Sequence, residues 1–162
     1  MKHSTHQKGV AAIEFGLLLV PMVTLAFGIT EFGRAMYQYN AIAKATRDAA
    51  RYMSMQTPGN ANAATVARNL VVYGKTAPSV DPPDKPLVPG LTVGNVAVKD
   101  SSTNPGTHAL QPVSAGGGAV TGVANLVTVE VSGFQFISSL SFVVPNITFG
   151  PIGTTMFGPP PS

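Results

Sequence analysis

The most prominent hydrophobic pattern is a long apolar run near the start of the chain. Residues 15–30 carry no charge, and the wider run 10–30 carries a single one, Glu14. At about 1.5 Å per helical residue, the wider run covers about 31 Å, close to the roughly 30 Å thickness of a hydrocarbon core. The pattern therefore predicts a transmembrane helix over residues 10–30.

The pattern becomes amphipathic after residue 30. Across residues 31–56, apolar or small side chains recur every three or four positions, with charged and polar side chains between them. This spacing is typical of a helix with one buried face. Residues 57–59, Thr-Pro-Gly, then end the helix. We expect one long helix with a membrane-spanning half and an amphipathic half, and a kink at Pro21 would be consistent with it.

Shorter patterns fill the rest of the chain. The region 57–75 predicts a second helix, from about Ala61 to Tyr73 with Gly74 as its stop, and residues 76–162 predict a loop-rich β region. Alternating or β-branched stretches predict strands within residues 91–98, 125–136 and 146–157, with a loop over 102–122. The expected fold class is α+β, with a small antiparallel sheet packed on the long helix.

Composition narrows the function classes. The chain of 162 residues has 17 Gly, 14 Pro and only 10% charged residues, which suits a membrane-anchored chain with a loop-rich outer part. It has no cysteine, which excludes disulfides, cysteine metal sites and cysteine nucleophiles. Outside the first nine residues His108 is the only histidine, and no carboxylate lies near it in sequence. We expect no enzymatic activity, no cofactor and no metal.

The distribution of charge adds little about partners. The net charge is +3, and most basic residues lie within 31–75, directly after the apolar run. Because no nucleic-acid reader motif accompanies them, we expect a solvated helix face or a contact with acidic lipid headgroups, and no nucleic acid. Basic residues flank the apolar run on both sides, so charge bias does not fix its orientation.

Two carboxylates border the predicted span. Glu14 within lipid would be costly by about 2.5–3.5 kcal/mol at the bilayer centre, which favours a functional role, whereas at headgroup level it would cost little. Glu31 lies three residues before Arg34. An i,i+3 ion pair between Glu31 and Arg34 is worth about 0.2–0.5 kcal/mol, and this pair is the preferred interpretation of these two residues.

The segments KGVAAIEFGLLL and FGITEFGRAMYQYNAIAKATRDAARY, within residues 8–55, resemble the TadE-like minor pseudopilins of bacterial tight-adherence (Tad, Flp-type) systems, which are related to type IV pili. The shared features are Gly9 before the apolar helix, Glu14 followed by Phe15, the run 27–35, and the helix end 46–52. The alternating stretch 125–136 is similar more loosely.

The resemblance implies specific roles for these residues. A prepilin peptidase would cut between Gly9 and Val10 and remove a leader of residues 1–9. Glu14, with Phe15 beside it, would then make an assembly contact with the new N-terminal ammonium of a neighbouring subunit. The recurrence of Glu31 and Arg34 in the family-like block leaves a subunit contact as their second interpretation.

The resemblance also implies partners and a location. The expected partners are a prepilin peptidase, a sister pseudopilin, the major pilin, an inner-membrane assembly platform and membrane lipid. The chain would cross the bacterial inner membrane once, with its N-terminus cytoplasmic and its C-terminal region periplasmic, and would enter or prime a pilus used for adhesion and biofilm formation. The alternative is a membrane-anchored or signal-cleaved surface binding module, cut after Ala26 or not at all.

Overall fold

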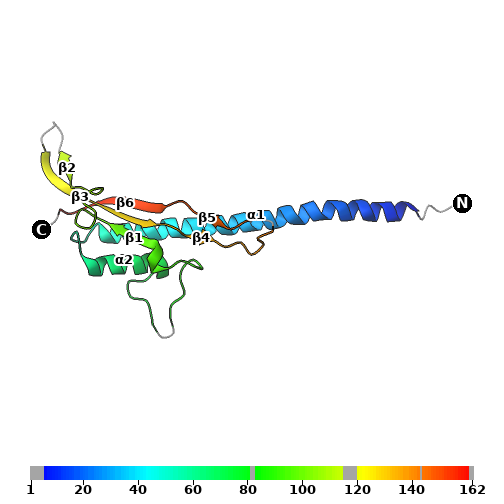
Figure 1. Ribbon diagram of the computed structural model, residues 1–162, viewed down its shortest axis with the longest axis horizontal. Helices are drawn as coiled ribbons and strands as arrows, with labels where there is room; N and C mark the ends of the chain where they lie inside the picture. The colour runs from blue at the N-terminus through cyan, green and yellow to red at the C-terminus, as the bar shows by residue number, and fades with distance from the viewer. Residues whose placement is uncertain (1–5, 81–82, 115–119, 143, 161–162) are drawn as a thin grey trace. The chain divides into compact units, whose positions relative to one another are not determined.

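The computed structural model describes residues 6–80, 83–114, 120–142 and 144–160, and its fold class is α+β, as predicted. A long N-terminal helix and a short second helix accompany a small antiparallel sheet that packs against the helices (Figure 1). The chain divides into two compact units. The N-terminal unit comprises Met1–Met36 and Phe136–Ile147, and the C-terminal unit comprises Tyr37–Gln135 and Thr148–Ser162.

The two helices begin and end close to where the sequence signals place them. Helix α1 (His6–Met53) contains Pro21 without interruption and ends three residues before the predicted limit. Helix α2 (Ala61–Tyr73) begins at Asn60, whose side chain accepts a hydrogen bond from the Ala63 N–H at 3.1 Å. It ends at Gly74, whose φ of 69° is the left-handed conformation that glycine adopts without strain.

Strand β3 (Val120–Val131) is the centre of the larger sheet, and its three partners are all antiparallel to it. These partners are β1 (Val96–Lys99), β2 (Gln111–Ser114) and β6 (Ile152–Gly158). A separate two-stranded sheet pairs β4 (Gln135–Phe136) with β5 (Ile147–Thr148). A single 3₁₀ turn, η1 (Val93–Asn95), precedes β1.

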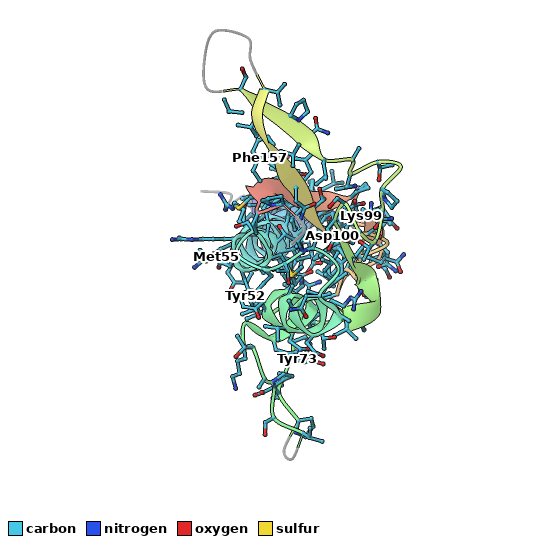
Figure 2. All side chains as sticks on the ribbon, turned by 90° about the vertical axis from the view of Figure 1, so that its left-hand side faces the viewer. Tyr52, Met55, Tyr73, Lys99, Asp100 and Phe157 are labelled. Carbon is cyan, nitrogen blue, oxygen red and sulfur yellow. The ribbon has the colours of Figure 1, made fainter. Side chains whose placement is uncertain are left out.

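The core of the C-terminal unit lies where the inner face of β3 meets the two helices. Val127, Val129 and Val131 alternate with more exposed residues and are buried, as expected for a strand with one covered face. Helix α2 lies alongside the C-terminal part of α1 in both views (Figures 1 and 2). The helix residues in the same core are Ile42, Ala45, Ala49, Ala50, Met53, Ala63, Ala67, Val71 and Val72.

The predicted loop over residues 102–122 was wrong, because it contains strand β2 and the start of β3. Pro112 pairs with Val123, and the register shifts between Val113 and Ser114. A proline and a register irregularity are both tolerated at a sheet edge, and both erase the alternation by which a strand is recognised in sequence. The first predicted strand also starts later than expected, since residues 93–95 form η1.

A buried carboxylate fixes the connection between the two helices. Asp100 is 2% exposed, and its Oδ2 accepts a hydrogen bond from the Gly59 N–H at 2.8 Å. Its Oδ1 accepts from the Ser102 N–H and from both the N–H and the hydroxyl of Thr103, at 2.7–3.0 Å. Burial raises the pKa of Asp100, but these hydrogen bonds outweigh it and lower the pKa below its ordinary value.

Asp100→Asn is expected to lower the free energy of unfolding by about 1 kcal/mol at neutral pH, because the amide group presents donors to donors. The folded-state pKa lies below the unfolded value of about 3.9, so the contribution of Asp100 is complete above that value and is lost as the pH falls through the folded-state pKa. Denaturant unfolding followed by circular dichroism should therefore show that the difference in free energy of unfolding between the unsubstituted protein and Asp100→Asn becomes smaller at acidic pH. The matched control is Asp48→Asn, at an exposed carboxylate of α1. An equal loss in both variants would contradict the prediction.

Candidate functional site

The N-terminal part of α1 exposes an apolar surface. It is long and apolar enough to cross a membrane, and its most apolar window has a mean hydropathy of 2.2 with none of its residues buried. The hydroxyls of Thr24 and Thr30 donate to the carbonyls of Val20 and Ala26 at 2.9 Å, so both are paired within the helix. A fully exposed apolar helix suggests a single-pass membrane anchor rather than the core helix of a soluble protein.

The predicted processing and assembly residues lie together at the start of this helix. Gly9, Val10, Glu14 and Phe15 are all exposed, and nothing lies within 4 Å of the position that a Cβ on Gly9 would take. Val10 and Glu14 are four residues apart and so share one helix face. Within the part of the chain that the structure describes, the Glu14 carboxylate makes no hydrogen bond or ion pair. Residues 1–5 of the predicted leader lie outside the described residues.

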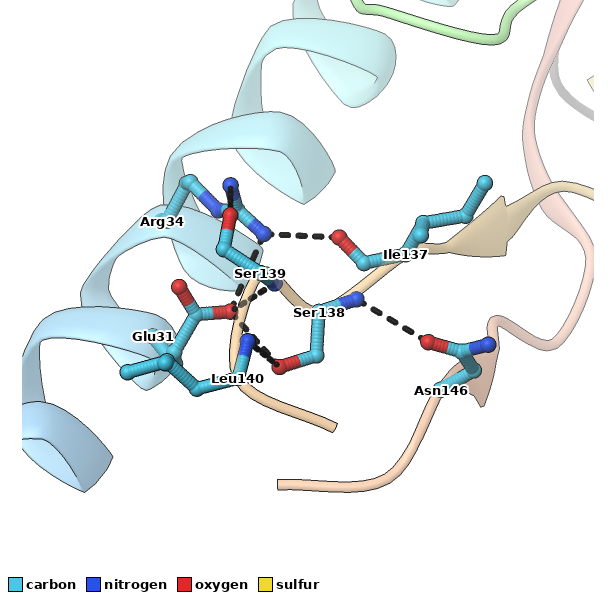
Figure 3. Close-up of polar contacts among 7 residues, drawn as sticks. All are labelled: Glu31, Arg34, Ile137, Ser138, Ser139, Leu140 and Asn146. Atoms are coloured by element: carbon cyan, nitrogen blue, oxygen red, sulfur yellow. Dashed lines mark hydrogen bonds and ion pairs between the residues drawn. The ribbon is translucent and has the colours of Figure 1, made fainter. Parts of the chain in front are cut away.

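Glu31 and Arg34 lie at the other end of the predicted span, and the structure brings a distant segment to them (Figure 3). The Glu31 Oε2 accepts from Arg34 Nη2 at 3.0 Å, from the Ser138 hydroxyl at 2.9 Å and from the Ser139 N–H at 3.2 Å. Arg34 in turn donates to the Ile137 carbonyl at 2.6 Å and to the Ser139 hydroxyl at 2.5 Å. We call these five residues the Glu31 cluster.

Further contacts order the segment that follows. The Ser138 N–H donates to Asn146 Oδ1 at 3.0 Å, and the Leu140 N–H donates to the Ser138 hydroxyl at 3.1 Å (Figure 3). The guanidinium of Arg34 lies 4.9 Å from the centre of the buried Phe136 ring, a favourable cation–π distance. The cluster therefore holds residues 136–140 against one turn of α1, mainly through charge-assisted hydrogen bonds.

The Glu31 cluster contains more contacts than the ion pair that the sequence predicted. The i,i+3 ion pair between Glu31 and Arg34 is present, but Glu31 is only 5% exposed and also bonds Ser138, 107 positions away. Sequence reasoning missed Ser138, Ser139 and Asn146, because short polar residues without periodic spacing give no signal of a contact partner. It also missed Ile137, which takes part through its backbone carbonyl and so without any signal from its side chain. Glu14 is not part of this cluster, since it lies 17 positions before Glu31 along α1, a rise of about 25 Å.

Comparison with known protein families matches one part of the chain. Residues 9–51 match the model of the family described as TadE-like protein. This segment is TadE-like. The match begins at Gly9 and includes Glu14, Phe15, Glu31 and Arg34, and it stops before the residues that complete the Glu31 cluster. No curated protein matches the chain. No solved structure matches it either.

The match confirms, over residues 9–51, the resemblance that the sequence motifs indicated. This family is in general not one of enzymes. The described residues hold no group of three or more His, Asp or Glu side chains that could bind a metal ion. His108, which is buried, shares hydrogen bonds with the hydroxyls of Thr107 and Thr128 at 2.9 and 2.8 Å, and these contacts give it a structural role.

Proposed function

We propose that this chain is a minor pseudopilin that is cut by a prepilin peptidase after Gly9 and then enters or primes a Tad-type pilus. The observation that carries the proposal is the TadE-like match, which starts at Gly9 and continues through the exposed apolar part of α1. In this proposal residues 1–9 are the leader and residues 10–30 cross the membrane.

Cleavage would create a partner for Glu14. Hydrolysis of the bond between Gly9 and Val10 consumes one water, leaves a carboxylate on Gly9 and leaves an ammonium group on Val10. A carboxylate exposed on a lipid-facing helix is costly when alone, and an ammonium group close to it offsets much of that cost. The ammonium group of a neighbouring mature subunit would then pair with Glu14. Contact between subunits would thus stabilise the charged Glu14 carboxylate, which lipid alone does not stabilise.

The proposal places the chain in the bacterial inner membrane with its N-terminus cytoplasmic and its C-terminal region periplasmic. Its partners would be the peptidase, a sister pseudopilin, the major pilin and the assembly platform, with adhesion as the outcome. Glu31 and Arg34, for which a subunit contact was the second interpretation, have their polar groups directed to residues 137–139 of the same chain. We assign them to holding that segment.

The proposal is tested by mass spectrometry of the mature N-terminus in a host with and without its prepilin peptidase. The expected result is a chain that starts at Val10 only when the peptidase is present. A chain that starts at Phe27, after cleavage by a signal peptidase, would overturn the proposal in favour of a secreted binding module. An intact Met1 in both strains would overturn it in favour of a plain membrane-anchored module.

A further inference from the structure

The segment that begins at the Glu31 cluster is uncharged and rich in apolar side chains. Residues 136–147, FISSLSFVVPNI, contain no charged side chain, and the chain has none after Glu130. Phe142 is 82% exposed and Ile137 is 66% exposed. Large apolar side chains with that exposure, gathered in one short segment, form an apolar patch of the kind that marks a lipid or protein contact.

The position of the segment along α1 shows which contact the patch makes. Val144 lines a shallow apolar groove together with Leu25, Gly28, Ile29 and Phe32, all within the N-terminal unit. Three of these helix residues belong to the predicted membrane span of residues 10–30. If that span lies in the bilayer, the part of the segment around Val144 lies at the depth of its last two turns.

The Glu31 cluster provides several of the hydrogen bonds that such a position requires. Irregular backbone is poorly tolerated near lipid unless its polar groups are paired. Here the Ile137 carbonyl is bonded to Arg34, the Ser139 N–H is bonded to Glu31, and the Val144 N–H is bonded to the Leu140 carbonyl at 3.0 Å. The two charges of the cluster pair with each other at 3.0 Å.

We propose that residues 137–142 and Val144 are a second membrane contact, whose Phe142 and Ile137 side chains enter the lipid interface beside the end of the predicted span nearest Glu31. The occupant of this surface is lipid, because the loop continues the lipid-facing surface of α1 at the same depth and carries no charge. The inference rests on α1 being a membrane anchor. It does not depend on cleavage after Gly9 or on assembly into a pilus.

The absence of tryptophan from the chain allows a direct test. Phe142→Trp introduces a single tryptophan into the full-length protein, which is reconstituted in phosphatidylcholine vesicles with or without lipids brominated along their acyl chains. Bromine quenches tryptophan only on close approach. The expected result is blue-shifted emission that falls to about half or less with bromolipid, most strongly when the bromines lie near the headgroup, as for a residue at the headgroup and acyl boundary.

Two matched variants control the measurement. Phe157→Trp replaces an exposed phenylalanine of β6 in the C-terminal unit and should not be quenched. Leu18→Trp replaces an exposed leucine in the middle of the predicted span and should be quenched most by bromines deep in the acyl chain. Ile137→Trp is a second probe of the loop and should behave as Phe142→Trp does, so that the result does not depend on one variant.

Each alternative result overturns the inference in a different way. Quenching at position 18 without quenching at 142 and 137 would leave the anchor intact and remove the loop from the membrane. Blue-shifted emission at 142 that bromolipid does not quench would show that another protein surface, such as a second copy of the chain, covers the patch. Absence of quenching at 18 would overturn the anchor and the loop contact together, whereas failure of the proposed pilus role leaves these measurements unaffected.

Discussion

Replacing Glu14 with glutamine is expected to abolish pilus assembly while leaving membrane insertion and cleavage after Gly9 intact. Glutamine has nearly the same shape as glutamate but cannot form an ion pair with the ammonium group of a neighbouring subunit. In a medium of low dielectric constant the lost attraction is large, and the neighbour's ammonium group is left without a partner in lipid. The effect should therefore appear at assembly, where subunits meet, and not in the isolated chain.

Electron microscopy of surface pili and immunoblotting of sheared filaments measure the result, with N-terminal mass spectrometry confirming cleavage. Glu14→Asp, which keeps the charge on a shorter side chain, should retain part of the assembly. Ile13→Ala is the matched control, because Ile13 is 70% exposed on the same turn and carries no charge. Normal piliation by Glu14→Gln would refute the pairing role and leave Glu14 as a residue at headgroup level.

Replacing Glu31 with glutamine is expected to release residues 137–140 from α1. Arg34, the Ser138 hydroxyl and the Ser139 N–H all donate to the same oxygen, Oε2. An amide oxygen can take its place, but it carries no negative charge, so it loses the attraction to Arg34 and accepts weaker hydrogen bonds from the two serines. Hydrogen bonds to a charged group are worth about 1.5–3 kcal/mol each, and because Arg34 is 37% exposed in its side chain, we expect a total loss of about 1–3 kcal/mol.

Amide hydrogen exchange of the protein in detergent micelles measures this release, because the Ser139 N–H is itself bonded to Glu31. A loss of 1.4 kcal/mol corresponds to about tenfold faster exchange. The matched control is Glu14→Gln, the same chemical change on the same helix at a residue that has no contact with this segment. Unchanged exchange at Ser139 and Leu140 in the Glu31 variant would show that packing, rather than the Glu31 cluster, holds the segment.

The features that the sequence predicted well are those that depend on the spacing of neighbouring residues. The uncharged run over residues 15–30, the stop at residues 57–59 and the alternation of Val127, Val129 and Val131 each depend on neighbouring positions, and each corresponds to an element of the fold. The TadE-like match also depends on neighbouring positions, because residues 9–51 lie within one continuous helix. Helices and half-buried strands can be predicted from sequence because buried and exposed positions recur along them with a fixed period.

The features that sequence did not predict depend on distant partners or on broken patterns. The contact of Glu31 with Ser138 joins positions 107 apart, and a serine carries the same sequence signal in a loop as in a buried cluster. Strand β2 was not predicted, because Pro112 and a register shift remove the alternation of apolar and polar residues that marks a strand. The roles of Gly9, Val10, Glu14 and Phe15 stay predictions, since they concern a peptidase and a second subunit rather than the fold of one chain.

The irregular outer strand of the larger sheet also bears on how crowded copies of the chain avoid aggregation. An open strand edge offers unpaired N–H and C=O groups on which another chain can add a strand and start a fibril. Pro112 has no N–H to offer, and the register shift after Val113 breaks the regular row of groups that an incoming strand would need. Strand β2 is therefore a poor template for uncontrolled polymerisation, which would compete with any ordered assembly through α1.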